Sequence, residues 1–327
     1  MYPLKFTKVL KEKVWGGREF ESFLGMNLEP GKTFGESWEV SAHPNGPSVV
    51  ADGPWAGKSL PELVAQEGAK LLGQALFERF KGKFPLLIKY LDIHDKLSIQ
   101  VHPEDAYALE KEGEFGKSEC WYILHASPDA QLIVGMAPGV SAEVFAQRSR
   151  QGQWDGLFRH VAVATGDFLH VTPGTVHASL TGSVLICEVQ QNSDTTYRIY
   201  DFDRLENGKL RPLHLDKALE VINFDEEPRL SRAGSRPRHE VPGAVLEPLV
   251  QDPYYTVDRL EVTGTYHQLA EDRFQIFSML EGTGSLVHSA KPYSVQAGET
   301  WFLPAGLEIT LNPDRPGQSL TVLKSTV

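Results

Sequence analysis

The sequence of 327 residues predicts a mainly β protein, arranged as barrels or sandwiches, with a few helices inserted in its N-terminal part. Three observations support this prediction. Most of the chain consists of short extended runs rich in Val, Ile, Leu, Tyr and Phe, and turn residues bound each run. Patterns typical of helices occur only before residue 225, and one strand–turn–strand motif built around Gly and Pro occurs twice.

The first series of strands is predicted before residue 225. These strands are expected at residues 83–93, 97–102, 119–125, 131–136, 160–164, 168–171, 184–190 and 195–202. Short strands at such regular spacing are typical of a β-sandwich or β-barrel.

Four helices are predicted among these strands, at residues 59–80, 103–112, 141–149 and 215–224. The first begins at Ser59, a residue type that caps helix N-termini, and has Pro61 and Glu62 in its first turn. The second begins at a proline and ends before Gly113, which is the usual asymmetry of helix ends.

A linker is predicted at residues 225–243, which lack periodicity and contain three prolines. Its four arginines could bind phosphate, but a solvated connector is the preferred interpretation. Further strands without any helical pattern are expected after it. The predicted domains are therefore residues 1–224, which carry the inserted helices, and an all-β module at residues 244–327.

The composition disfavours several classes of protein. Acidic residues number 43 and basic residues 32, and a net charge of −11 disfavours nucleic-acid binding. The sequence shows neither the apolar stretch of a secretory signal nor the run of about 18 apolar residues of a membrane span. Cys120 and Cys187 are too few for a disulfide scaffold and are expected to be buried thiols. We therefore expect a cytoplasmic protein that acts on a small molecule, without a nucleic-acid or membrane partner.

The repeated motif relates residues 166–177 to residues 298–309. Each copy has a glycine, a short strand, a Pro-containing turn and the start of another strand. The motif resembles the second motif of the cupin family, whose members are small jelly-roll β-barrels that hold a metal ion. The first copy keeps His177, whereas Ile309 stands where the metal-binding histidine would be. The resemblance implies two cupin-like barrels, of which only the first holds a metal.

Polar residues recur at alternate positions of two predicted strands, and alternate residues of a strand share one face. Ser98, Gln100 and His102 share a polar face at the end of one strand. Lys117 and Glu119 share a face at the start of the next. A glutamate beside Cys-Trp-Tyr-Ile-Leu is expected to pair with a cation or to bind a metal.

Two histidines, a carboxylate and an amide form a set of ligands suited to zinc or another divalent metal. The candidates are His102, Glu119 and His177, with Gln100 as an optional fourth ligand. Three protein ligands leave room for water or a substrate oxygen, which is the arrangement of catalytic rather than structural sites.

A third polar face is predicted where Asp194, Thr196, Arg198 and Tyr200 alternate along a strand. Arg198 stays protonated at any working pH, so it can stabilise an oxyanion or hold a phosphate but cannot readily act as a base. A surface ion pair between Asp194 and Arg198 is the simpler alternative.

Seven motifs in a fixed order resemble the type I phosphomannose isomerase (mannose-6-phosphate isomerase) family in its short bacterial form. They are WGG at 15–17, GESWEVSAHP at 35–44, FPLLIK at 84–89, QVHP at 100–103, KSE at 117–119, PGTVHA at 173–178 and SD with the following arginine at 193–198. The resemblance implies a zinc-dependent interconversion of mannose 6-phosphate and fructose 6-phosphate, with one zinc ion per chain. The implied zinc ligands are His102, Glu119 and His177, joined in some members by Gln100. Arg198 matches the family's catalytic arginine.

An aldose–ketose isomerisation moves one proton between C1 and C2 and another between O1 and O2, through an enediol. In that chemistry Arg198 would stabilise negative charge and Lys117 would contact substrate oxygens. The expected substrate-binding residues are Lys89, Ser98 and Asp194. The general base stays open among Asp194, Lys117 and His43.

Two other functions are considered. Another metal-dependent cupin enzyme would favour a compact His-x-His motif with a nearby glutamate, whereas 16 residues separate His102 from Glu119 here. A non-catalytic sugar-phosphate-binding cupin would be expected to lack a metal ligand or Arg198. The sequence leaves open whether the protein is a monomer or a homodimer.

Overall fold

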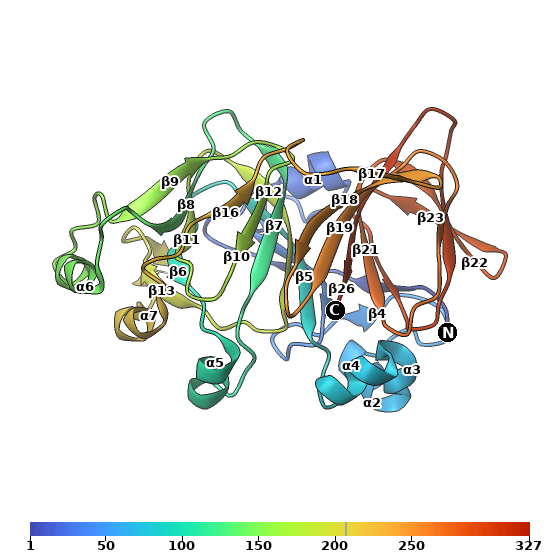
Figure 1. The fold of residues 1–327 in the computed structure, drawn as a ribbon, viewed down its shortest axis with the longest axis horizontal. Coiled ribbons are helices and arrows are strands. Elements are labelled where there is room, and N and C mark those ends of the chain that lie inside the picture. Colours follow the sequence, from blue (N-terminus) through green and yellow to red (C-terminus); the bar gives the residue numbers. More distant parts are fainter. Residues whose placement is uncertain (207) are drawn as a thin grey trace.

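The computed structural model describes residues 1–206 and 208–327. They form two β modules that lie side by side, the first on the left of Figure 1 and the second on the right. Each module contains two antiparallel sheets whose apolar faces enclose a core. The prediction of a mainly β protein with two barrel-like modules is confirmed.

The first module consists of a seven-stranded and a five-stranded sheet. The larger sheet has the order β16 (Arg229–Ser231), β10 (Phe168–Val171), β7 (Glu119–Ala126), β12 (Val184–Gln191), β5 (Leu86–Ile93), β3 (Glu36–Ser41) and β2 (Val9–Lys11). The smaller sheet has the order β13 (Tyr197–Tyr200), β6 (Ile99–Val101), β11 (His177–Thr181), β8 (Gln131–Met136) and β9 (Phe158–Ala162).

The second module consists of an eight-stranded and a four-stranded sheet. The larger sheet has the order β17 (His239–Val241), β18 (Ala244–Gln251), β19 (Thr256–Val262), β26 (Leu320–Thr326), β21 (Gln275–Glu281), β24 (Thr300–Leu303), β1 (Leu4–Thr7) and β4 (Val49–Val50). The smaller sheet has the order β20 (Tyr266–Gln268), β25 (Ile309–Pro313), β22 (Thr283–His288) and β23 (Lys291–Gln296).

The larger sheets of the two modules also pack against each other. Every residue of β5 and of β12 is buried, because one face of these strands lines the core of the first module and the other faces the second module. Cys120 and Cys187 lie in this interface as free, buried thiols, as predicted. The candidate site residues Lys89 on β5 and Glu119 on β7 therefore lie on strands that are packed on both faces.

The path of the chain between the modules differs from the simple division predicted from the sequence. Strands β1 and β4 belong to the first 224 residues but pair within the second module's large sheet, where β1 joins β24. The segment 225–243 supplies one strand to each module, since β16 pairs with β10 and β17 pairs with β18. The sequence of such a short strand shows which of its side chains are apolar, but it does not show which neighbouring strand it pairs with.

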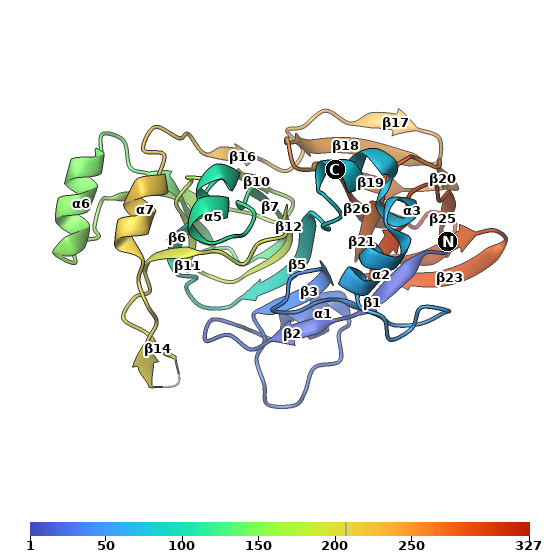
Figure 2. The same ribbon diagram turned by 90° about the horizontal axis from the view of Figure 1, so that it is seen from below.

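In residues 1–206 and 208–327, seven helices lie along the two modules (Figures 1 and 2). They are α1 (Glu19–Leu24), α2 (Leu60–Glu67), α3 (Ala69–Leu72), α4 (Gln74–Arg79), α5 (Asp105–Lys111), α6 (Ala142–Arg150) and α7 (Leu215–Val221). A hairpin of β14 (Leu205–Glu206) and β15 (Lys209–Leu210) follows β13. Residues 225–327, all of which the structure describes, contain no helix, as predicted. Within the described ranges, no helix is long and apolar enough to cross a bilayer.

The helix predicted over residues 59–80 is divided into three. Ser59 caps its first part, as predicted, and exchanges hydrogen bonds with Glu62. The chain breaks at Gly68 and Gly73, whose φ angles are +52° and +93°. A Cβ atom on Gly73 would lie 2.3 Å from the carbonyl oxygen of Asp272, so the close approach of the second module requires glycine there.

A polar contact joins the start of β7 to the turn between β18 and β19. The Ser118 hydroxyl donates to Asp252 Oδ2 at 3.2 Å and lies 3.0 Å from the Tyr255 hydroxyl oxygen. His170 Nε2 lies 3.0 Å from the same Asp252 oxygen. Ser118 stands between Lys117 and Glu119, so the second module holds the backbone that carries two candidate site residues.

We expect the substitution Asp252→Ala to lower the free energy of unfolding by about 1–3 kcal/mol, because Ser118 and His170 would lose a buried partner. Urea unfolding at constant pH measures this change. Asp314→Ala, in an exposed turn, serves as the control and should change little. Equal stability of the two variants would contradict the importance of the contact.

Candidate metal and substrate site

Three buried side chains bring their ligand atoms together in the first module. His102 follows β6, Glu119 begins β7 and His177 begins β11. One ligand atom of each lies within 4.8 Å of the others. His177 Nε2 is 3.1 Å from Glu119 Oε1, and His102 Nε2 is 3.5 Å from Glu119 Oε2. Residues that are distant in sequence thus form one compact cluster.

Backbone carbonyl groups set the orientation of both imidazole rings. His102 Nδ1 lies 3.0 Å from the Thr195 carbonyl oxygen, and His177 Nδ1 lies 3.0 Å from that of Thr175. Because a carbonyl oxygen can only accept, each Nδ1 carries the proton and each Nε2 keeps its lone pair. Metal-binding histidines are commonly oriented by contacts of this kind.

The chemistry of this cluster fits a divalent cation. Over residues 1–206 and 208–327, His102 Nε2 and both carboxylate oxygens of Glu119 are buried without a hydrogen-bond partner. Burial and the charge of Lys117 hold the pKa of His102 well below its usual range, so its ring is neutral. Burial alone would raise the pKa of Glu119, but the positive charge of Lys117 holds it well below its usual range. Neutral imidazoles and a carboxylate are ligands that zinc and similar ions prefer.

Gln100 reaches the same cluster. It lies opposite His177 in the register between β6 and β11, and its Nε2 is 3.2 Å from His177 Nε2. A half-turn of the amide would direct its oxygen at the ligand atoms instead. The structure therefore places Gln100 where an optional fourth ligand would be.

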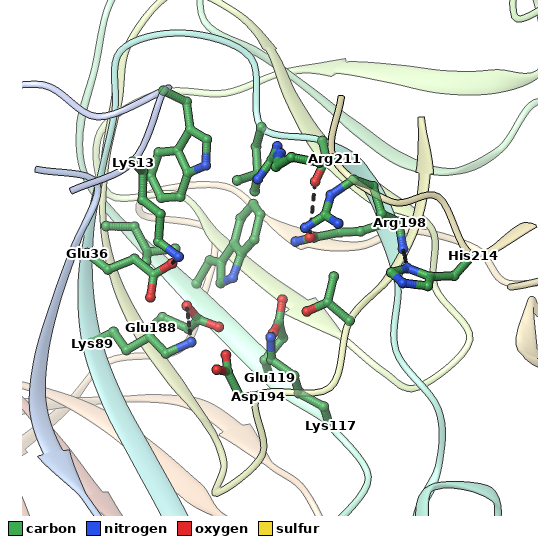
Figure 3. Close-up of a pocket in the computed structure, with 17 residues that line it drawn as sticks. Lys13, Glu36, Lys89, Lys117, Glu119, Glu188, Asp194, Arg198, Arg211 and His214 are labelled. Carbon is green, nitrogen blue, oxygen red and sulfur yellow. Dashed lines mark hydrogen bonds and ion pairs between the residues drawn. The ribbon is translucent and has the colours of Figure 1, made fainter. Parts of the chain in front are cut away.

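A cavity of about 320 Å³ adjoins the cluster (Figure 3). Among its lining residues are seven that the sequence predicted: Lys89, Ser98, Gln100, Lys117, Glu119, Asp194 and Arg198. Alternation along the extended chain explains part of this arrangement, since Lys117, just before β7, and Glu119, its first residue, both face the cavity while Ser118 points to the second module.

One side of the cavity alternates basic and acidic groups (Figure 3). Lys13 Nζ lies 2.8 Å from Glu36 Oε1, and Lys89 Nζ lies 3.9 Å from Glu188 Oε2. Burial alone would lower the pKa of Lys89, but the surrounding carboxylates, Glu188 first, raise it above its usual value. Burial also raises the pKa of Glu188, and the nearby Glu119 adds to that rise.

Two guanidinium groups face the cavity from the other side (Figure 3). Arg198 lies on β13 opposite Gln100, and its Nη1 donates to the Pro212 carbonyl oxygen at 3.0 Å. Arg211 donates twice to Asp201, with its Nε 2.7 Å from Oδ2 and its Nη2 bonded to Oδ1. The carboxylate of Asp201 thereby fixes the Arg211 fork beside Arg198.

The polar face predicted on β13 is only partly present. Asp194, Thr196 and Arg198 line the cavity, but Asp194 accepts a hydrogen bond from Asn45 Nδ2 at 2.8 Å instead of pairing with Arg198. Tyr200 stacks on Trp154, with ring centroids 4.6 Å apart, outside the cavity. The register of β13 shifts between Arg198 and Tyr200, which ends the alternation at that point.

His43, predicted as one possible base, lies elsewhere. It lines a second cavity of about 520 Å³ and its Nε2 is 3.1 Å from Glu114 Oε1. Within the described part of the chain it is not among the residues that line the cavity beside the metal cluster.

Several ionisable residues of the cavity were not predicted from the sequence, namely Lys13, Glu36, Glu188, Arg211 and His214. A signal was present for Glu188, a single carboxylate within an apolar strand, which is the pattern that singled out Glu119. Arg211 gave no comparable signal, because it reaches the cavity from a loop rather than from an alternating strand.

Known proteins resemble the chain over nearly its whole length. A model of the phosphomannose isomerase type I catalytic domain matches residues 3–122, and a model of the mannose-6-phosphate isomerase cupin domain matches residues 247–311. A mannose-6-phosphate isomerase of Streptococcus mutans is 38% identical over 92% of this chain and 92% of its own length. A probable mannose-6-phosphate isomerase of Bacillus subtilis is 40% identical over 93% of this chain and 94% of its own.

The chain belongs to the type I phosphomannose isomerase family. The crystal structure of the mannose 6-phosphate isomerase from Bacillus subtilis agrees, with a TM-score of 0.88 at 36% identity and complete coverage of both chains. The family and the cupin-type fold that the sequence motifs predicted for this chain are thus confirmed.

We expect a divalent metal ion to stabilise the metal-free protein. An ion present at 100 times its dissociation constant would add about 2.7 kcal/mol to the free energy of unfolding. Calorimetry with and without Zn²⁺ measures the rise in Tm, and His177→Ala should abolish it because a ligand is lost.

The variant His239→Ala, which removes an exposed histidine, should keep the full rise in Tm. The same rise in His177→Ala and in the unsubstituted protein would show that the ion binds elsewhere.

Proposed function

We propose that this chain interconverts mannose 6-phosphate and fructose 6-phosphate. The observation that carries the proposal is the buried His102–Glu119–His177 cluster at the wall of a polar cavity that Arg198 also lines. Membership of the type I family supports the same reaction. So does the similarity to proteins named mannose-6-phosphate isomerase.

The metal is proposed to be zinc, with one ion per chain. His102, Glu119 and His177 would hold it, with Gln100 as a fourth ligand. When bound, the ion supplies Lewis acidity toward the substrate's carbonyl and hydroxyl oxygens. A single ion is expected because Ile309 occupies the corresponding position of the second module, inside an apolar core.

Arg198 is proposed as the catalytic residue that stabilises the enediolate. Its charge is permanent, and its Nε is buried without a hydrogen-bond partner in the described ranges, so donor capacity remains for a substrate oxygen. Lys117, whose Nζ lies 3.4 Å from Glu119 Oε2, adds a second cation beside the metal ligands. Negative charge that develops on O1 or O2 would thus meet positive groups already in place.

The phosphate group of the substrate needs donors away from the metal ligands. Arg211 offers a guanidinium fork that Asp201 holds in place, and a fork of this geometry suits phosphate oxygens. Ser98 and Lys89 line the same cavity and complete the proposed substrate-binding set with Asp194.

The proton that moves between C1 and C2 must pass through a group that lines the cavity. Asp194 and Lys117 meet this requirement, and Glu188, which lines the same cavity, is a third candidate. Burial alone would raise the pKa of Asp194, but Lys89 and Asn45 lower it, so Asp194 is ionised and can accept a proton. The cytoplasmic location and the choice between monomer and homodimer stay predictions from the sequence.

Chelation should abolish the conversion of mannose 6-phosphate to fructose 6-phosphate, and added zinc should restore it. A coupled assay that consumes fructose 6-phosphate measures the rate, and elemental analysis should find one zinc per chain. Full activity in protein shown to be free of metal would contradict the proposed role of the ion. Two tightly bound zinc ions per chain would contradict the proposal that only the first module binds metal.

The substitution Arg198→Ala should lower kcat by roughly 10²–10³ with a smaller effect on KM, because a contact made mainly in the transition state acts on turnover. Arg198→Lys should recover only part of the loss, since an ammonium does not reproduce the planar fork. Steady-state kinetics with metal content checked gives both constants, and Arg315→Ala on the surface is the control. A raised KM with normal kcat would move Arg198 to phosphate binding.

A further inference from the structure

The carboxylate of Glu114 joins three segments that are far apart in the sequence. Glu114 lies in the connection between α5 and β7, and its Oε2 lies 3.0 Å from the Thr195 hydroxyl. The same oxygen lies 3.3 Å from the Ser193 hydroxyl and 3.3 Å from the Asp194 backbone nitrogen. Its other oxygen, Oε1, lies 3.1 Å from His43 Nε2. One side chain therefore accepts from every residue of the 193–195 loop and from His43.

The 193–195 loop carries two groups on which the site depends. The carbonyl oxygen of Thr195 lies 3.0 Å from His102 Nδ1, so the position of this carbonyl sets the orientation of a metal-ligand ring. Asp194 lines the substrate cavity. A displacement of this loop would therefore turn the imidazole of His102 and move a cavity carboxylate at the same time.

The hydrogen bonds of His43 determine its protonation pattern. Its Nδ1 accepts from the backbone N–H of Asn45 at 3.1 Å, so its Nε2 carries the proton and donates to Glu114. The His43 side chain is 4% exposed, and its ring lies edge-on to Trp38 with centroids 6.0 Å apart. A buried donor of fixed direction thus orients the Glu114 carboxylate.

The turn that contains His43 holds the 193–195 loop at a second point. Asn45 Nδ2 donates to Asp194 Oδ2 at 2.8 Å. His43 acts on the same loop through Glu114, whereas Asn45 contacts it directly. Two independent contacts therefore connect this turn to the residue that lines the substrate cavity.

We propose that His43 and Glu114 are a pair of positioning residues that keep the 193–195 loop, and through Thr195 the ring of His102, in the metal-binding arrangement. The proposal rests on the proposed metal site, and it assigns to His43 a role other than that of general base. The pair acts at a distance from the reacting atoms, because His43 lies outside the substrate cavity in the described part of the chain.

Zinc affinity tests the proposal directly and does not require turnover. The dissociation constant for Zn²⁺ would be measured by competition with a chromophoric chelator, at a temperature where circular dichroism shows every variant to be folded. Glu114→Ala should weaken zinc binding by about tenfold or more, as is typical when a group that orients a ligand is lost. Glu114→Gln, which keeps one acceptor oxygen, should recover part of the affinity and carries the same test if the alanine variant does not fold.

A double-mutant cycle tests whether the two residues act as one unit. His43→Ala should weaken zinc binding less than Glu114→Ala does, because the contacts between Glu114 and the loop remain. The double variant should bind zinc no more weakly than Glu114→Ala alone, since His43 acts through Glu114. Additive losses would show that His43 acts independently and would overturn the pairing.

Glu112 supplies a matched control from the same segment. It is also a carboxylate with two partners, the Tyr197 hydroxyl at 2.8 Å and Lys217 Nζ at 2.6 Å, but it has no contact with the 193–195 loop among the described residues. Glu112→Ala should keep the original zinc affinity even where it lowers Tm. If Glu114→Ala lowered Tm but left the zinc affinity unchanged, Glu114 would have only a structural role. That result would overturn the proposal.

Kinetics separate the positioning role from catalysis. If His43 were the general base, His43→Ala would lower kcat severely while zinc affinity stayed normal, and that result would overturn the proposal. If the unsubstituted protein binds zinc but does not convert mannose 6-phosphate, the proposed function is wrong. The zinc affinities of the variants would still test whether His43 and Glu114 position the metal-binding residues.

Discussion

The constraint on which this structure depends is a carboxylate buried between two imidazoles. Glu119 is 1% exposed, and its oxygens face His102 and His177 without hydrogen bonds within residues 1–206 and 208–327. An ionised carboxylate in such surroundings is costly unless cations compensate it. Lys117 supplies one such cation, and a bound metal ion would supply the other. Strands β6, β7 and β11 position these groups. The register of these strands in the first module is therefore constrained by the site as well as by the core.

The same requirement extends into the cavity. Five basic side chains line it, Lys13, Lys89, Lys117, Arg198 and Arg211, against the four acidic ones Glu36, Glu119, Glu188 and Asp194. A dianionic substrate and a divalent cation therefore enter a region in which basic groups outnumber acidic ones, and burial further favours the protonated form of Glu188 by raising its pKa. Fixed groups of both signs in a confined space stabilise charge that develops during a reaction without having to reorient. Tight pairing of acids and bases thus holds the walls in place before a substrate arrives.

Strand alternation explains which parts of the site could be predicted from the sequence. The two-residue spacing of Gln100 and His102, and of Lys117 and Glu119, requires each pair to share a face, and both pairs meet at the same cluster. The family motifs added His177 and Arg198. Glu114 was not predicted, because its role comes from contacts with residues about 70 to 80 positions away, which no local pattern encodes. Strand β1 and its pairing with β24 were not predicted for the same reason, and the break at Gly73 depends on the close approach of Asp272 in the second module.

A comparison of the two modules shows that the side chains, rather than the fold, determine where the candidate metal-binding residues come together. His177 begins β11 and lies opposite Gln100 on β6, while Ile309 begins β25 and lies opposite Gln268 on β20. In the second module Gln268 accepts a hydrogen bond from the Tyr266 hydroxyl at 2.9 Å, and Ile309 packs into an apolar core. The imidazole of His177 therefore has no counterpart in the second module, and the amide oxygen of Gln268 already has a partner there. The second module also holds Ser118 in the backbone of the first, between the two residues that project into the substrate cavity.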